Sequence, residues 1–91
     1  MNTQRVEVFY TGRVQGVGFR YTTHRISESF TIRGWVKNLP DGRVQLVGEG
    51  ERQELQRFLD AIDATLGEHI RERSVDWQIP QHEPNGFRIA Y

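Results

Sequence analysis

Residues 6–20 read VEVFYTGRVQGVGFR, and the pattern of this stretch changes halfway along. In its first third, alternate residues form one apolar face, and this period of two predicts a first β-strand. Three glycines between residues 12 and 18 then interrupt the alternation and indicate a loop. From Phe19 to about Phe30 the apolar spacing becomes helical. The stretch therefore predicts a strand, a glycine-rich loop and a helix, in that order.

The residues that follow predict a hairpin and a second helix. Alternation from Ile32 to Asn38 predicts a second strand, and residues 43–48 predict a third. Between them, Leu39-Pro40-Asp41-Gly42 is a strong turn signal, because Pro presets φ and Gly accepts a positive φ. So short a turn indicates an antiparallel hairpin. Between Glu51 and Leu66, apolar residues recur at helical spacing, which predicts the clearest helix of the chain.

Two short apolar alternations complete the pattern. Val75–Ile79 predicts a fourth strand, and Phe87–Tyr91 predicts a short extra C-terminal strand. The order strand–helix–strand–strand–helix–strand is the split βαβ plan of a ferredoxin-like α/β sandwich, an α+β fold. We expect an antiparallel sheet with both helices on one face, where right-handed crossovers place them. Residues 1–91 contain no linker or repeat and are expected to form a single domain.

Composition excludes several classes of function. Lys plus Arg and Asp plus Glu number 12 each, so no overall field draws the chain to nucleic acid or membrane, and an anion site must be local. The absence of cysteine excludes thiolate nucleophiles and Cys-ligated metals, and the 3 histidines lack ligand spacing. We therefore expect no metal and no cofactor. No segment approaches ~18 apolar residues, and no leader precedes the first strand, so we expect a cytoplasmic protein. The sequence leaves the oligomeric state open, and a monomer is the default expectation.

The glycine loop is a candidate anion cradle. Gly16 and Gly18 permit a positive φ and remove side chains that would keep an anion away. The start of the helix adds unpaired N–H groups and a partial positive charge. Arg20 lies in the first turn, where a cation is disfavoured electrostatically, so a functional role is indicated; its guanidinium can bind two phosphoryl oxygens at once. Taken alone, the loop is equally well explained as a tight turn, and its spacing matches neither a Walker A loop nor a dinucleotide fingerprint.

Asn38 is a second candidate, at the end of the second predicted strand. A neutral amide both donates and accepts hydrogen bonds, which suits orienting a water molecule without adding negative charge near a phosphate. On residue type alone, however, an Asn before Pro-Asp-Gly is more often an ordinary turn residue. The water-orienting role is therefore a hypothesis at this point.

Two segments together resemble the signatures of the acylphosphatase family. Gly12–Arg20 (GRVQGVGFR) resembles the first signature, and Gly34–Val44 (GWVKNLPDGRV), continuing to Glu49-Gly50, resembles the second. Their separation and the predicted strand order also match, so the resemblance covers essentially the whole chain. Three positions depart from the family pattern, and the sequence leaves their effect on stability and substrate preference open: Tyr10, Thr31 and Ala90.

The resemblance implies an activity and a set of site residues. The expected reaction is metal-independent hydrolysis of the carboxyl–phosphate anhydride of acyl phosphates, with inorganic phosphate as product and inhibitor. Arg20 is assigned to the phosphate and Asn38 to the nucleophilic water, as the catalytic pair. Backbone N–H groups are expected to bind the phosphoryl group from six residues: Gln15, Gly16, Val17, Gly18, Phe19 and Arg20. The physiological acyl group cannot be read from the sequence.

Two other interpretations remain. The first is a non-catalytic ferredoxin-like module that binds anions or RNA; Trp35 and Arg43 are weak indications of the aromatic, basic sheet surface that RNA recognition requires. The second is a domain of the kind that opens larger maturation proteins that use carbamoyl phosphate. Because the chain ends at Tyr91, we expect a stand-alone enzyme instead.

Overall fold

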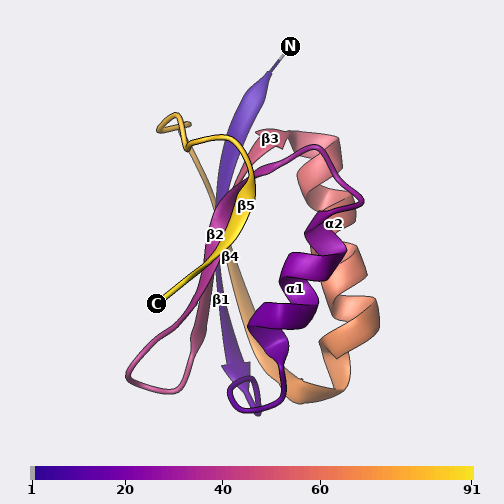
Figure 1. Ribbon diagram of the computed structural model, residues 1–91, viewed down its shortest axis with the longest axis vertical. Coiled ribbons are helices and arrows are strands. Elements are labelled where there is room, and N and C mark those ends of the chain that lie inside the picture. Colours follow the sequence, from indigo (N-terminus) through magenta and orange to yellow (C-terminus); the bar gives the residue numbers. More distant parts are fainter. Residues whose placement is uncertain (1) are drawn as a thin grey trace.

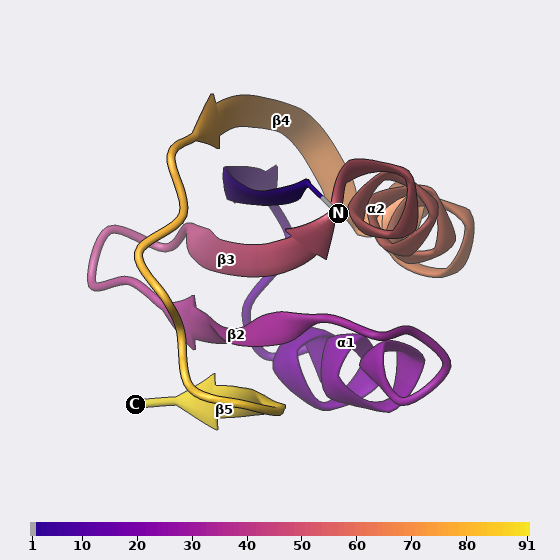
Figure 2. The ribbon, with the colours of Figure 1, turned by 90° about the horizontal axis from the view of Figure 1, so that it is seen from above.

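The structure, a computed structural model, describes residues 2–91 and has the predicted ferredoxin-like fold. Figures 1 and 2 show two layers, with both helices on one face of the sheet. Along the chain the elements are β1 (Thr3–Gly12), α1 (Phe19–Ser27), β2 (Arg33–Asn38), β3 (Val44–Glu51), α2 (Arg52–Leu66), a 3-10 turn (Gly67–His69), β4 (Ile70–Gln78) and β5 (Phe87–Ala90).

The sheet has the strand order β4-β1-β3-β2-β5, and it is mixed where the sequence predicts an antiparallel sheet. Three of its four strand pairings follow the prediction: β1 is antiparallel to β3 and β4, and β2 is antiparallel to β3. β5 instead pairs parallel with β2, with Gly34 opposite Phe87. The loop after β4 crosses the sheet on the side away from the helices and leads to β5 at the opposite edge, where β5 runs parallel to β2 (Figure 2).

The core lies between the sheet and the helices, and its residues are those that the periodicity predicts. Tyr10, at the end of β1, packs against Phe19, the first residue of α1, with ring centroids 5.0 Å apart. This contact fixes where the helix starts relative to the strand. The apolar face of α2 is buried along its whole length: Leu55, Phe58, Leu59, Ile62 and Leu66.

Several boundaries differ from the predicted ones, including the start of β1 at Thr3 and the end of β3 at Glu51, and two of the differences have a clear physical reason. α1 ends at Ser27, because the next three backbone N–H groups donate to carbonyls only three positions earlier, at 3.1–3.2 Å, and this tighter turn carries the chain on to Phe30. β4 begins at Ile70 instead of Val75. Its first half is an exposed, charged edge strand, and such a strand has no apolar alternation to reveal it.

A buried ionic cluster holds the loop between β4 and β5. Glu49 is 0% exposed and Arg5 7%, and Arg5 Nη1 lies 3.0 Å from Glu49 Oε2 and 2.9 Å from Glu83 Oε2. The backbone N–H groups of Gln81 and Glu83 donate to the Glu49 carboxylate at 2.6 and 2.9 Å. Burial by itself raises the pKa of Glu49, but these hydrogen bonds and Arg5 outweigh it and lower the pKa below its usual value.

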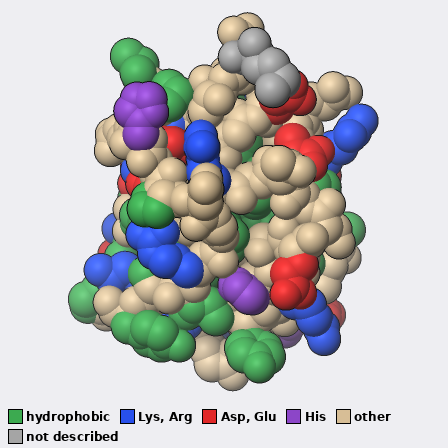
Figure 3. All heavy atoms as spheres, turned by 45° about the horizontal axis from the view of Figure 1, so that its top comes forward, with side chains coloured by type: hydrophobic (Ala, Val, Ile, Leu, Met, Phe, Trp, Pro, Cys, Tyr) green, Lys and Arg blue, Asp and Glu red, His purple; other side chains and the backbone are tan. Residues whose placement is uncertain are grey.

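The surface matches the neutral composition. On the face drawn in Figure 3, positive and negative side chains are interspersed over the molecule. Within residues 2–91, both helices are too short and too polar to cross a membrane.

Candidate active site

The residues of the two sequence motifs meet at one end of the sandwich, where β1 ends, α1 begins and β2 ends. There they line one cavity of about 180 Å³. The wall of this cavity contains five of the predicted site residues, namely Gly16, Gly18, Phe19, Arg20 and Asn38, and four others, namely Val14, Tyr21, Ile89 and Tyr91. Gln15 and Val17 belong to the same loop but lie outside this lining.

The loop has the backbone conformation that its glycines predict. Gly16 and Gly18 have positive φ angles of 78° and 75°. A Cβ atom on either residue would meet nothing within 4 Å, so crowding is not the reason for glycine here. The left-handed backbone itself requires these glycines, since an L side chain is strained in that conformation.

The start of α1 is open to an anion. Gly18 is the N-cap and supplies no side-chain cap, and the first helical hydrogen bond runs from the Thr22 N–H to the Gly18 carbonyl, at 2.9 Å. The N–H groups of the preceding first turn therefore have no helical acceptor. Among the residues of that turn none is acidic. Backbone donors and the positive end of the helix dipole thus lie at the cavity.

Arg20 is half-buried, and it lines this cavity together with Tyr91. The central carbon of its guanidinium is 5.0 Å from the centroid of the Tyr91 ring, a cation–π arrangement. No carboxylate of the described chain pairs with Arg20, so its charge is available to an anion. Tyr91, which is 91% exposed, is a site residue that the sequence reasoning missed. No local pattern predicts a contact between distant parts of the chain.

Asn38, the last residue of β2, has a carbonyl oxygen with an unused hydrogen-bonding capacity. Its Oδ1 atom is buried, and no donor among residues 2–91 reaches it. Buried polar atoms are normally paired with protein or water. Asn38 therefore lines the cavity while its Oδ1 atom lies just beneath the surface without a hydrogen-bond partner.

Gln15 connects the loop to the hairpin turn that follows Asn38. Its side-chain Nε2 donates to the carbonyl oxygens of Leu39 and Arg43, at 2.8 and 2.9 Å. The turn is also closed by its own backbone, with Leu39 N–H donating to Arg43 O at 2.8 Å and Gly42 N–H to Leu39 O at 3.1 Å. The sequence predicts only a backbone role for Gln15, so these side-chain bonds are an additional finding.

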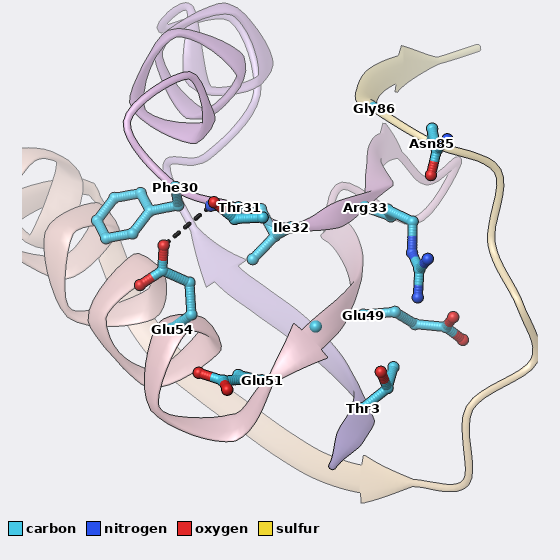
Figure 4. Close-up of a pocket in the computed structure, with 11 residues that line it drawn as sticks. Thr3, Phe30, Thr31, Ile32, Arg33, Glu49, Glu51, Glu54, Asn85 and Gly86 are labelled. Carbon is cyan, nitrogen blue, oxygen red and sulfur yellow. Dashed lines mark hydrogen bonds between the residues drawn. The ribbon is translucent and has the colours of Figure 1, made fainter. Parts of the chain in front are cut away.

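A larger cavity, of about 780 Å³, lies at the opposite end of the sandwich (Figure 4). Arg33 and Glu49 are cross-strand partners in its wall, and the Thr31 N–H donates to Glu54 Oε2 at 2.9 Å. None of the predicted site residues lines it. In the described part of the chain, no group of three or more His, Asp or Glu side chains is arranged to hold a metal ion. The chemistry of the smaller cavity therefore identifies it as the candidate site.

Known proteins resemble this chain over nearly its whole length. The model of the acylphosphatase family matches residues 6–89. An acylphosphatase of Roseiflexus sp. is 40% identical over 93 aligned residues, which cover 100% of this chain and 99% of the relative. An acylphosphatase of Nostoc sp. is 60% identical over 84 residues, covering 92% of this chain and 80% of the relative. The crystal structure of acylphosphatase from Bacillus subtilis is similar with a TM-score of 0.86 and 32% identity, and the match covers 97% of this chain and 99% of that one.

Proposed function

This chain belongs to the acylphosphatase family and is a hydrolase of acyl phosphates, and we propose that Arg20, Asn38 and the glycine loop carry out the hydrolysis. The reaction splits the carboxyl–phosphate anhydride with water, giving a carboxylate and inorganic phosphate. One observation supports the assignment above all: the glycine loop, the guanidinium of Arg20 and the amide of Asn38 share the wall of one small cavity.

In this proposal the phosphoryl group sits at the start of α1. Backbone N–H groups between Gln15 and Arg20 donate to its oxygens, and the guanidinium of Arg20 binds two of them at once. The uncapped helix start and the unpaired charge of Arg20 support this placement. These donors are preorganised, so they stabilise the charge that develops on the phosphoryl oxygens in the transition state.

Asn38 is proposed to hold the attacking water through its side-chain amide, in line with the bond that breaks. The water oxygen forms a bond to phosphorus, the bond between phosphorus and the acyl oxygen breaks, and its electron pair leaves with the carboxylate. The proton of the water passes to a phosphoryl oxygen. A carboxylate departs without protonation, so positioning and charge stabilisation are sufficient and neither an enzyme base nor a metal is required.

The proposal includes three statements about partners and location. Inorganic phosphate is the product and a competitive inhibitor, because the cradle recognises any tetrahedral anion. The protein acts as a monomer, which light scattering on the purified protein tests. It acts in the cytoplasm, which fractionation of the source cells tests.

Kinetics of Asn38→Ala with benzoyl phosphate test the assignment. Asn38 acts on water and the loop on phosphate, so kcat should fall roughly 10²–10³-fold, while the Ki of inorganic phosphate stays within a few-fold of wild type. Asn85→Ala, an exposed residue at the opposite end, is the matched control and should leave both constants unchanged.

Two outcomes contradict this proposal in different ways. An intact kcat with weakened phosphate inhibition would move Asn38 into the anion cradle. Absence of turnover by the wild-type protein, in both metal-free and Mg²⁺ buffers, would favour the non-catalytic anion-binding module.

A further inference from the structure

Gln15 lies beside the proposed catalytic groups without lining their cavity, and we propose that it is a positioning residue for the hydrolysis. Its side chain holds the hairpin turn, and with it Asn38, at a set position relative to the phosphate loop. This inference rests on the proposed function, because it gives Gln15 its role through Asn38. It starts from the two hydrogen bonds from Gln15 Nε2 to the carbonyls of Leu39 and Arg43.

The hydrogen-bond inventory of the turn explains why an amide is required at this position. The carbonyls of Leu39 and Arg43 each already accept one backbone N–H of the turn, and a carbonyl oxygen has room for a second donor. The Gln15 NH₂ group has two hydrogens, one for each carbonyl. A carboxylate offers no donor at all, and a thioether offers none either, so neither Glu nor Met can replace this contact.

The sheet does not provide an equivalent connection. β3 lies between β1 and β2, so the strand that leads into the loop and the strand that ends at Asn38 are not hydrogen-bonded to each other. The turn itself lies on the surface, with Pro40, Asp41 and Gly42 exposed. The side chain of Gln15 is therefore a direct bridge between the loop and the turn, and it acts one residue away from Asn38.

The bridge has a kinetic consequence that separates positioning from binding. The phosphate donors belong to the loop and to the start of α1, and these remain in place when the Gln15 side chain is changed. The water-orienting amide belongs to the other side of the bridge. A misplacement of about 1 Å at a reacting group can lower a rate roughly 10²-fold. Loss of the bridge should therefore lower kcat and leave phosphate binding nearly unchanged.

The first experiment compares Gln15→Met with Gln45→Met, using benzoyl phosphate as substrate and inorganic phosphate as inhibitor. Gln45 is the matched control, because its Nε2 also makes a partly buried side-chain hydrogen bond, to Glu7 Oε2 at 2.7 Å, but on the helix-free face. Gln15→Met should lower kcat roughly 10- to 100-fold with the Ki of phosphate within about twofold of wild type. Gln45→Met should keep the wild-type kcat. A folded Gln15→Met protein with wild-type kcat would overturn the inference.

The second experiment is a double-mutant cycle with Asn38→Ala. If Gln15 acts through Asn38, Gln15→Met should change kcat by less than about twofold once Asn38 has been removed. Losses that multiply would mean that Gln15 acts independently of Asn38 and would overturn the positioning role.

Amide hydrogen exchange gives a measurement that does not depend on turnover. In Gln15→Met the N–H groups of Leu39 and Gly42 should exchange faster, while those in the β1–β4 ladder keep their wild-type rates. Unchanged exchange in the turn would overturn the bridge itself. If exchange rises but Asn38→Ala leaves kcat intact, the bridge stands and the proposed role of Asn38 fails, so the two failures are distinguishable.

Discussion

The guanidinium of Arg20 lies over the ring of Tyr91, 5.0 Å from its centroid, so the arginine proposed to bind phosphate contacts a residue that follows the last strand, β5. Tyr91 follows β5, and β5 reaches this position by its parallel pairing with β2. The edge strand that the sheet adds to the basic split βαβ plan therefore has a direct effect at the site.

Removing the ring of Tyr91 should weaken catalysis without weakening the fold. A cation–π contact at an exposed site contributes ~0.5–1 kcal/mol, so we expect kcat/KM of Tyr91→Ala to fall roughly two- to fivefold. Tyr91→Phe keeps the ring and should keep the activity. Because Tyr91 is almost fully exposed, thermal unfolding should be unchanged in both variants. Equal activity of Tyr91→Ala and wild type would contradict a role for the ring.

Arg20→Lys should nearly abolish turnover, because an ammonium group cannot bind two oxygens as a planar guanidinium does. We expect kcat to fall roughly 10²–10³-fold or more, on the scale of losing one preorganised donor to the transition state. Arg25→Lys is the control, since Arg25 is exposed on the same helix and outside the cavity lining. Near-wild-type turnover of benzoyl phosphate by Arg20→Lys would remove the guanidinium from the mechanism.

Gly18→Ala tests the effect of the loop's backbone conformation apart from the effect of steric crowding. Alanine meets no neighbouring atom there but must adopt a φ of +75°, which costs roughly 1–2 kcal/mol and favours reorientation of the loop amides. We expect a folded protein with a raised Ki for inorganic phosphate, measured by inhibition. Gly67→Ala is the matched control, because Gly67 has an ordinary helical φ of −57° and equally open surroundings. It should leave phosphate inhibition unchanged and unfolding unchanged or slightly shifted upward.

Glu49 should make the stability of the protein depend on acid pH. Its pKa in the folded protein is lower than the ordinary value of 4.5, so its contribution is fully present above pH 4.5 and is lost as the pH falls through the folded pKa. Glu49→Gln should lower the free energy of unfolding by ~3 kcal/mol at pH 7, since one partner of a buried pair is removed. Its urea midpoint should also change less than that of wild type between pH 7 and pH 3.

The controls for Glu49 follow from its position. Glu51→Gln, on an exposed neighbour in the same strand, should behave as wild type. Activity per folded molecule should be unaffected in Glu49→Gln, because Glu49 lines the cavity at the opposite end from Arg20. A Glu49→Gln protein with the wild-type acid profile would show that another carboxylate carries the pH dependence.

Much of the fold is readable from the sequence because local patterns determine it. The alternation before Tyr10, the helical spacing from Leu55 to Leu66 and the Pro-Asp-Gly turn each correspond to one element of the structure. The parallel pairing of β5 has no such local signal. Its partner strand is determined by the long loop that crosses the sheet between β4 and β5.

Parts of the candidate site and of the ionic cluster could not be predicted from the sequence, and the physical reason differs between residues. Residue chemistry left the roles of Gly16, Gly18, Arg20 and Asn38 open, and the resemblance of the two motifs to a known family selected them; the structure brings all four to one cavity. The contacts of the Gln15 side chain depend on two carbonyls in another motif. Burial of Glu49 depends on the loop above it, and a carboxylate in an alternating strand is otherwise expected to face solvent.

The strand order also sets a kinetic problem for the newly made chain. β1 comes first in the sequence and lies inside the sheet, yet one of its neighbours is β4. In this antiparallel pairing Arg5 lies opposite Gln78, far along the chain. The chain loses the entropy of closing a very long loop before the hydrogen bonds between β1 and β4 can form. Two-state domains with such distant contacts fold slowly, in milliseconds to seconds. Until residues 70–78 arrive, one backbone edge of β1 has no partner, and during that interval the chain is exposed to pairing with another molecule.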